Sequence, residues 1–290
     1  MLLIKNAADL DRWLGKERLA GRSIGFVPTL GALHAGHISL IDISKKATDL
    51  TVCSIFVNPT QFNDPKDFQK YPVTIEKDMS LLEGSGTHVL FLPSVEELYP
   101  GGIKGLENYE LGYLETILEG QYRPGHFQGV CQVMRRLLDR VRPDHLFMGQ
   151  KDYQQCMVVR RLMDLMGSGT VFHTCPIVRE ADGLAMSSRN LRLTSAQRTK
   201  ATAIFRALSK LKEDWEASDG KGGAENAPAL TDPAKVLLAA QDFKVDYVEI
   251  ADAVTLEPLR KFNREQRTVA LVAAFMGEVR LIDNMLLENH

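Results

Sequence analysis

Short apolar runs alternate with longer segments of helical periodicity through the first ~175 residues. Strands of such continuous hydrophobicity, each separated from the next by a helix, are typical of a parallel sheet that is covered on both faces. We therefore predict an α/β fold, a Rossmann-like doubly wound parallel sheet, over residues 1–175. The predicted strands are 23–27, 50–57, 88–92, 145–149 and 170–175, and the predicted helices begin at about 37 and cover 74–84, 128–141 and 152–166.

The pattern changes after Pro176, where shorter and more polar elements follow. A polar helix is predicted from Thr194–Ser195, with the TSAQ segment as its cap. Residues 216–233 are rich in Gly, Ala and Pro, which is typical of a mobile surface loop. We predict a smaller C-terminal α+β domain over 176–290, with a ligand cleft between the two domains. Its strand candidates are 245–250, 268–275 and 279–286.

Composition narrows the class of function. The chain has 290 residues, 44% of them hydrophobic and 25% charged, and a net charge of −2. Such a charge provides no general attraction to nucleic acid or anionic lipid, so we expect small-molecule substrates and neither nucleic-acid nor membrane partners. No stretch approaches the ~18 apolar residues of a membrane span, and the first residues lack the features of a signal peptide, so we expect a cytoplasmic protein. The four cysteines share no CxxC spacing and lie in apolar runs, which predicts buried thiols.

The segment PTLGALHAGH, residues 28–37, follows the first predicted strand and opens the first predicted helix. Ligands of parallel sheets lie at the carboxyl ends of strands, and the N–H groups at a helix start favour a phosphate. Gly31 and Gly36 would let such a ligand approach the backbone closely. His34 and His37 can project on the same side, where imidazoles could bind phosphate oxygens and donate a proton to a departing oxygen. Two capping histidines are the alternative, and a zinc site would lack a third ligand at a suitable spacing.

Two further segments carry groups that suit a nucleotide. GQKDYQQ at 149–155 follows a predicted strand, and Lys151 offers a charge to a transferring phosphate, Asp152 an acceptor to ribose hydroxyls and Gly149 a close backbone approach. SSRN at 187–190 combines two hydroxyl groups with a guanidinium, which suits phosphate oxygens. A solvated surface pair and a polar turn are the respective alternatives.

The segment PTLGALHAGHISLI resembles the signature of the pantothenate synthetase family, a variant of the HxGH motif of nucleotidyltransferases. Further blocks look like those of the same family, in the same order and over nearly the whole chain. Departures from the family pattern are mild, with Leu30 in place of Met and Ala35 and Gln150 in place of Glu. The blocks are FVNPTQF at 56–62, YP at 71–72, RPGHFQGV at 123–130, GQKDYQQ at 149–155, DGLAMSSRN at 182–190, DYVEI at 246–250 and RLIDN at 280–284.

The resemblance implies an ATP site and a pantoate site. Gln61 and Gln155 would hold pantoate, with Gln61 also near β-alanine, and Mg²⁺ would bridge phosphate oxygens. The catalytic groups would be His37, His34, Lys151 and Arg189, with His37 the proton donor to the leaving group. The ATP-binding residues would be Leu30, Gly31, Ala32, Leu33, His34, Ala35, Gly36, His37, Gly149, Gln150, Lys151, Asp152, Val178, Met186, Ser187, Ser188 and Arg189.

The resemblance also implies a reaction and an assembly. An ATP-dependent condensation of pantoate with β-alanine would pass through pantoyl adenylate, in a homodimer whose C-terminal domain acts as a lid. The 123–130 block would shape the wall of the pantoate pocket, although we favour a structural role for His126. We expect a structural role also for His88, His145 and His173, which lie in predicted strands. Two alternative functions remain, that of a nucleotidyltransferase that needs no amine acceptor and that of a binding module that has lost catalytic turnover. Small size and the lack of a basic excess disfavour a tRNA synthetase.

Overall fold

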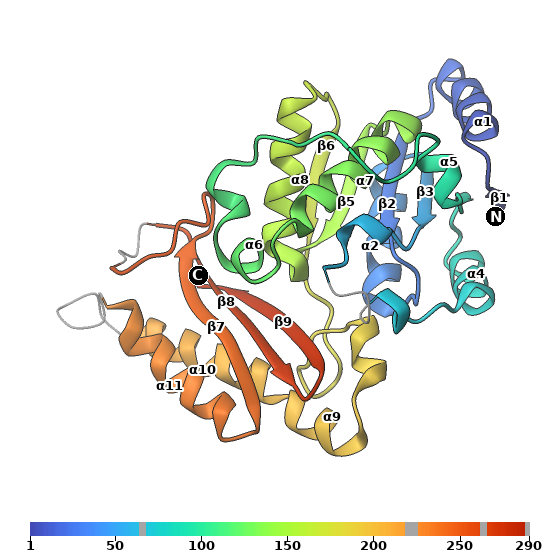
Figure 1. The fold of residues 1–290 in the computed structure, drawn as a ribbon. Coiled ribbons are helices and arrows are strands. Elements are labelled where there is room, and N and C mark those ends of the chain that lie inside the picture. Colours follow the sequence, from blue (N-terminus) through green and yellow to red (C-terminus); the bar gives the residue numbers. More distant parts are fainter. Residues whose placement is uncertain (64–67, 218–225, 262–265, 288–290) are drawn as a thin grey trace. The chain divides into compact units, whose positions relative to one another are not determined.

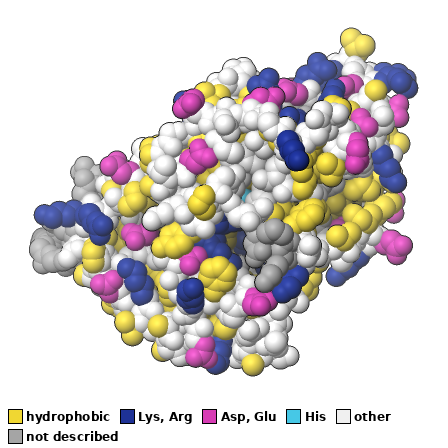
Figure 2. Space-filling view, viewed as in Figure 1, with side chains coloured by type: hydrophobic (Ala, Val, Ile, Leu, Met, Phe, Trp, Pro, Cys, Tyr) yellow, Lys and Arg dark blue, Asp and Glu magenta, His cyan; other side chains and the backbone are white. Residues whose placement is uncertain are grey.

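The computed structural model describes residues 1–63, 68–217, 226–261 and 266–287. The chain divides into two compact units, Met1–Pro176 and Ile177–His290 (Figure 1). On the face drawn in Figure 2, basic and acidic side chains are interspersed, in keeping with the small net charge. Within the described residues, every helix is too short or too polar to cross a bilayer.

The first unit is built on a six-stranded sheet in the order β1-β4-β3-β2-β5-β6, and every neighbouring pair of strands is parallel. All residues of β3 are buried, which requires cover on both faces and accounts for its unbroken run of apolar and small residues. The predicted α/β sheet is therefore confirmed. The strands are β1 (Leu2–Ile4), β2 (Ile24–Thr29), β3 (Leu50–Ile55), β4 (Val89–Phe91), β5 (His145–Gly149) and β6 (Val171–Cys175).

The helices of the first unit form two groups (Figure 1). α2 and α4 pack with Val27, Cys53 and Leu90 in one apolar cluster on one face of the sheet. α7 contacts both α1 and α8. The helices are α1 (Ala7–Leu19), α2 (Ala35–Ala47), α4 (Ile75–Gly84), α5 (Val95–Leu98), α6 (Leu118–Tyr122), α7 (His126–Val141) and α8 (Tyr153–Leu165), with short 3₁₀ turns η1 (Pro59–Gln61), η2 (Gly112–Glu115) and η3 (Gln150–Asp152).

The first predicted strand ends at Val27, but the corresponding β2 continues through Pro28 to Thr29. A proline has no N–H to donate and is usually excluded from a central strand. It is tolerated here because β5 pairs with β2 only as far as Phe26, so no ladder with β5 is interrupted at Pro28. The edge strand β1 was not predicted, because three residues give too short a pattern.

The second unit carries an antiparallel sheet of β7 (Phe243–Asp252), β8 (Thr268–Met276) and β9 (Val279–Leu286). The three predicted strands are confirmed. The helices α9 (Ser195–Ala201), α10 (Ala203–Ala217) and α11 (Ala227–Ala239) accompany the sheet, and α10 and α11 pack on it around the buried Trp215 (Figure 1). The TSAQ cap is also confirmed, because the Thr194 side chain and N3 residue Gln197 form a capping box.

The prediction of a surface loop over 216–233 was wrong at both described ends. Residues 216–217 close α10, and Ala227 begins α11, which contains Pro228 in its first turn and Pro233 inside it. The helical signal is the spacing of its buried residues Ala227, Leu230, Thr231, Ala234 and Leu238. Composition concealed this spacing, because proline and small residues also favour loops. Residues 218–225 lie outside the described residues.

Candidate active site

Three predicted site segments lie at one edge of the parallel sheet. The loop that carries His34 and His37 follows β2, η1 with Gln61 follows β3, and η3 with Lys151 follows β5. Because β3, β2 and β5 are neighbours and run parallel, their carboxyl ends meet at the same edge. The chain leaves β2 toward β3 on one side and returns at β5 on the other, which is the switch point where open α/β sheets bind ligands.

The loop after β2 is held from behind by a buried carboxylate on α4. Gly31 and Ala32 have positive φ angles of 84° and 50°. The N–H groups of Ala32 and Leu33 donate to the two oxygens of Asp78, at 2.9 and 2.8 Å, and the Thr74 hydroxyl donates to the same carboxylate at 3.0 Å. Asp78 is fully buried. These two loop N–H groups therefore face the protein interior and are not available to a phosphate.

Asp78 is not among the residues predicted from the sequence. A signal was present, because Asp78 lies three residues after Ile75 and four before Leu82, on the face of α4 that packs against the sheet. A charged residue at such a position is rarely buried without partners. The N–H groups that bond to Asp78 belong to residues 45 and 46 positions away in the chain. The helical pattern therefore shows that a carboxylate is buried, but it does not show which groups stabilise the buried charge.

His34 and His37 form a capping box at the start of α2. His34 Nδ1 accepts from the Gly36 N–H at 3.2 Å, and His37 Nδ1 accepts from the His34 N–H at 3.3 Å. An acceptor nitrogen carries no proton, so in each neutral imidazole the proton lies on Nε2. Neither Nε2 has a hydrogen-bond partner among the described residues. The capping alternative is thus correct as a structural role, and it leaves the Nε2–H group of each ring unused by the described residues.

The environment keeps both imidazoles neutral. Burial lowers the pKa of His34 from 6.5 to about 4, and the charge of Lys151 lowers it further. Burial lowers the pKa of His37 to about 3, with smaller contributions from His34 and Lys151. The two rings are tilted against each other, with centroids 4.1 Å apart. At neutral pH these histidines are therefore uncharged hydrogen-bond donors.

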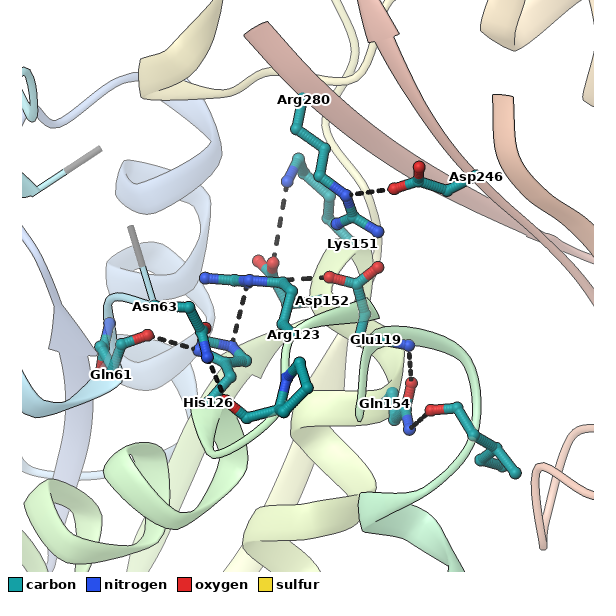
Figure 3. Close-up of polar contacts among 12 residues, drawn as sticks. Gln61, Asn63, Glu119, Arg123, His126, Lys151, Asp152, Gln154, Asp246 and Arg280 are labelled. Carbon is teal, nitrogen blue, oxygen red and sulfur yellow. Dashed lines mark hydrogen bonds and ion pairs between the residues drawn. The ribbon is translucent and has the colours of Figure 1, made fainter. Parts of the chain in front are cut away.

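The charge of Lys151 contributes to the lowered pKa of both imidazoles. The Lys151 Nζ is 3.8 Å from an oxygen of Asp152, and the Lys151 side chain is 17% exposed whereas that of Asp152 is 45% exposed (Figure 3). The ammonium is thus largely shielded from water, where its charge acts more strongly on a nearby phosphate. Gly149, at the end of β5, and Gln150 in η3 complete the predicted segment.

The two predicted pantoate glutamines differ in their surroundings. Gln61 is 8% exposed, and its Oε1 accepts from the buried Asn58 Nδ2 at 3.3 Å. Gln155 is half-buried in the first turn of α8, and its amide has no hydrogen-bond partner among the described residues.

The neighbouring Gln154 is buried and serves the fold instead. It donates to the carbonyl groups of Leu114 and Ile117 and accepts from the Glu119 N–H (Figure 3). Only one glutamine of the QQ pair is therefore available to a ligand. Asn58 and Gln154 are supporting residues that the sequence analysis did not single out.

The other predicted structural residues have partners in the fold. His88 Nδ1 accepts from the Thr51 N–H at 3.0 Å, and the rings of His145 and His173 are joined by a 2.8 Å hydrogen bond between adjacent strands. His126 is buried and bonded to the Gln61 backbone and to Arg123. The prediction of buried thiols is confirmed, because Cys53, Cys131, Cys156 and Cys175 are all buried and reduced. Burial raises the pKa of each of these thiols.

The remaining predicted residues belong to the second unit. Val178 and Met186 face each other across a short antiparallel ribbon, where the Met186 N–H donates to the Val178 carbonyl at 3.0 Å. Gly183, with φ of 90°, makes the turn of this ribbon. Ser187 caps the 3₁₀ turn η4 (Ser188–Arg192) by accepting from the Arg189 N–H at 3.3 Å. Two hydroxyl groups and a guanidinium therefore share one turn directly after the ribbon.

Comparison with known proteins identifies the family. A family model described as Pantoate-beta-alanine ligase matches residues 2–286. The chain belongs to the pantoate–β-alanine ligase family. Pantoate–β-alanine ligases are ATP-dependent ligases, so the predictions of family, fold class and enzyme class are confirmed.

Relatives of this ligase family match the whole chain. The pantothenate synthetase of Porphyromonas gingivalis is 40% identical over 290 residues and that of Pseudothermotoga lettingae 42% over 288, with at least 99% of each chain covered. The pantothenate synthetase structure from Thermus thermophilus has a TM-score of 0.89 at 39% identity, with both chains fully covered. A pantoate–β-alanine ligase from Francisella tularensis, solved with β,γ-ATP and β-alanine, has a TM-score of 0.80 at 35% identity, covering 100% of this chain and 99% of that one.

Proposed function

We propose that this ligase joins pantoate to β-alanine at the expense of ATP through a pantoyl-adenylate intermediate, releasing AMP and pyrophosphate. The observation that carries the proposal is the histidine capping box beside Lys151, at the switch point of the sheet. It presents two Nε2–H donors and an ammonium at the start of a helix, which suits the phosphates of ATP. The relative solved with β,γ-ATP and β-alanine supports the choice of substrates.

ATP would lie along the loop after β2 and the turn after β5. The Leu30–His37 and Gly149–Asp152 segments would contact the nucleotide, although the N–H groups of Ala32 and Leu33 are already used by Asp78. Among the described residues, no three His, Cys, Asp or Glu side chains form a group that could hold a metal ion. Mg²⁺ would arrive with ATP as part of the substrate and be held mainly through phosphate oxygens, as is usual for this ion at nucleotide sites.

In the first step, a carboxylate oxygen of pantoate attacks the α-phosphorus and the bond to the bridging oxygen of pyrophosphate breaks. His34, His37 and Lys151 stabilise the charge that gathers on the phosphate oxygens, because their donors are fixed before the reaction begins. The triphosphate raises the pKa of His37 from its low value in the free protein, so that this residue can protonate the departing oxygen.

In the second step, the unprotonated amine of β-alanine attacks the acyl carbon of pantoyl adenylate and AMP leaves. Gln61 and Gln155 hold the hydroxyl and carboxylate groups of pantoate, since an amide can both donate and accept. Gln61, anchored by Asn58, would also lie near β-alanine.

The second unit is proposed to act as a lid. Ser187, Ser188 and Arg189 would bind the phosphates and Val178 and Met186 the adenine end, excluding water from a reactive acyl adenylate. We also propose a cytoplasmic homodimer, which light scattering of the purified protein would test.

The test is an incubation with ATP, Mg²⁺ and pantoate, with and without β-alanine, followed by identification of products by mass. We expect pantothenate, AMP and pyrophosphate in equal amounts when β-alanine is present. When it is absent we expect a single turnover that leaves an enzyme-bound adenylate and releases an equal amount of pyrophosphate. Continuous release of a nucleotide product without β-alanine would indicate the alternative nucleotidyltransferase, and no ATP consumption would indicate a binding module. The matched control is Lys151→Ala, which should keep the fold and lose adenylate formation.

A further inference from the structure

The 3₁₀ turn that carries Gln61 is tightly docked on the first turns of α7. A Cβ at Gly129 would lie 2.2 Å from the Thr60 carbonyl oxygen, so only glycine permits this approach. The Gly129 carbonyl in turn accepts from Asn58 Nδ2 at 3.0 Å. Farther along, Asn63 Nδ2 donates to the Pro124 carbonyl (Figure 3). The chain is therefore held on both sides of Gln61, by Gly129 of α7 on one side and by the Pro124 carbonyl just before α7 on the other.

His126, the first residue of α7, contacts Gln61 itself. Its Nδ1 is 2.7 Å from the Gln61 carbonyl oxygen, and its Nε2 is 3.1 Å from Arg123 Nη1 (Figure 3). A carbonyl oxygen only accepts and a guanidinium only donates, so Nδ1 must carry the proton and Nε2 must be the acceptor. The two partners thus select the Nδ1–H tautomer, the opposite of the tautomer in His34 and His37.

Arg123 is held in its turn. Its Nη1 is 3.7 Å from an oxygen of Glu119, which is 7% exposed, and the Glu119 N–H donates to Gln154 Oε1 at 2.9 Å. The Arg123 side chain is itself 18% exposed. A largely buried series of contacts therefore runs from Gln154 through Glu119, Arg123 and His126 to the carbonyl of Gln61 (Figure 3).

We infer that His126, oriented by Arg123, is a positioning residue that fixes the Gln61 amide for pantoate. The inference rests on the proposed function, because it assigns Gln61 to pantoate. The Gln61 carbonyl belongs to the last residue of η1, so a shift of this backbone group would swing the side-chain amide that follows from the same Cα. A displacement of ~1 Å in a positioning group costs about 100-fold in rate, which makes such a support consequential.

Two substitutions at His126 test whether the Nδ1–H donor is the part of the ring that matters. In His126→Asn the side-chain NH₂ can occupy the place of Nδ1 and still donate to the Gln61 carbonyl, whereas in His126→Gln the longer amide reaches toward the place of Nε2. We expect His126→Gln to raise the KM for pantoate by about tenfold or more while the KM for ATP stays within about twofold. His126→Asn should stay within about threefold of the wild type for both substrates.

Arg135→Gln is the matched control, because Arg135 lies on the exposed side of the same helix in an ion pair with Asp139. The inference is overturned if His126→Gln leaves the pantoate KM within about twofold of wild type. It is also overturned if His126→Asn is as defective as His126→Gln, or if both KM values rise together.

Failure of the proposed function is a separate result, since it appears in the wild type as an absence of pantothenate. Nitrogen-15 NMR of the histidine rings tests the geometry without any substrate. It should show His126 as the Nδ1–H tautomer, and an Nε2–H tautomer would refute the assigned contacts.

Discussion

Removing the acceptor behind the β2 loop provides a sharp test of how the ATP site is built. Asp78 accepts from the N–H groups of Ala32 and Leu33 and from the Thr74 hydroxyl, and it is fully buried. In Asp78→Asn the side chain keeps its shape, but one of its two oxygens becomes an NH₂ group. Whichever way the amide turns, one loop N–H then faces a donor and loses its partner.

The magnitude follows from the number of N–H groups left without an acceptor. A buried N–H that loses its partner costs about 1–3 kcal/mol, so Asp78→Asn should lower the free energy of unfolding by that amount. Asp78→Ala leaves both N–H groups without an acceptor and should cost about 2–6 kcal/mol. Because Ala32 is held at a positive φ, the loop should relax once released and reduce the rate of adenylate formation by up to about 100-fold.

The assay combines urea unfolding, hydrogen exchange of the 30–37 segment and pantoate-dependent pyrophosphate release. Glu76→Gln is the matched control, because Glu76 is exposed in the same helix and the charge change is the same. The control should stay within about 0.5 kcal/mol of wild type. If Asp78→Asn behaves like the control in stability and its loop amides exchange no faster than in the wild type, the reasoning about Asp78 is refuted.

Three further predictions concern the histidines and the docking of η1. His37→Asn retains an oxygen acceptor for the cap but lacks Nε2–H, so single-turnover pyrophosphate release should fall by about 10²–10³-fold with the fold intact, and near-normal release would exclude its catalytic role. The pKa values of about 4 for His34 and about 3 for His37 in the folded protein lie below the ordinary 6.5. As the pH falls, these two histidines are therefore protonated in the unfolded chain before they are protonated in the folded protein. The free energy of unfolding in urea should therefore fall as the pH decreases from about 6.5 to about 4. It should fall less steeply in the double variant His34→Asn, His37→Asn, and an equal slope in both proteins would contradict the lowered pKa values. Gly129→Ala should displace η1 and raise the pantoate KM, whereas Gly84→Ala, where a Cβ meets nothing within 4 Å, should not; equal KM values would contradict the tight docking.

Local patterns along the chain were enough to predict nearly all of the strands, several of the helices and the groups that carry the chemistry. Continuous apolar runs predicted the strands of the parallel sheet apart from the short β1, and the TSAQ segment predicted the cap of α9, because these signals are local. The position of His34 and Lys151 directly after strands pointed to a ligand site for the same reason. Composition misled where it overrode spacing, at the end of α10 and in α11.

Which of these groups are neighbours, and which protonation state each one has, depends on the folded arrangement of the chain. The order of strands places β5 beside β2, although β3 and β4 come between them along the chain. The partner of Asp78 lies 46 residues away and that of His126 65 residues away. Periodicity reports which face of an element is buried, but not what packs against that face. Hydrogen-bond partners and desolvation, which select the tautomers of these histidines and lower the pKa values of His34 and His37, exist only once the chain has folded.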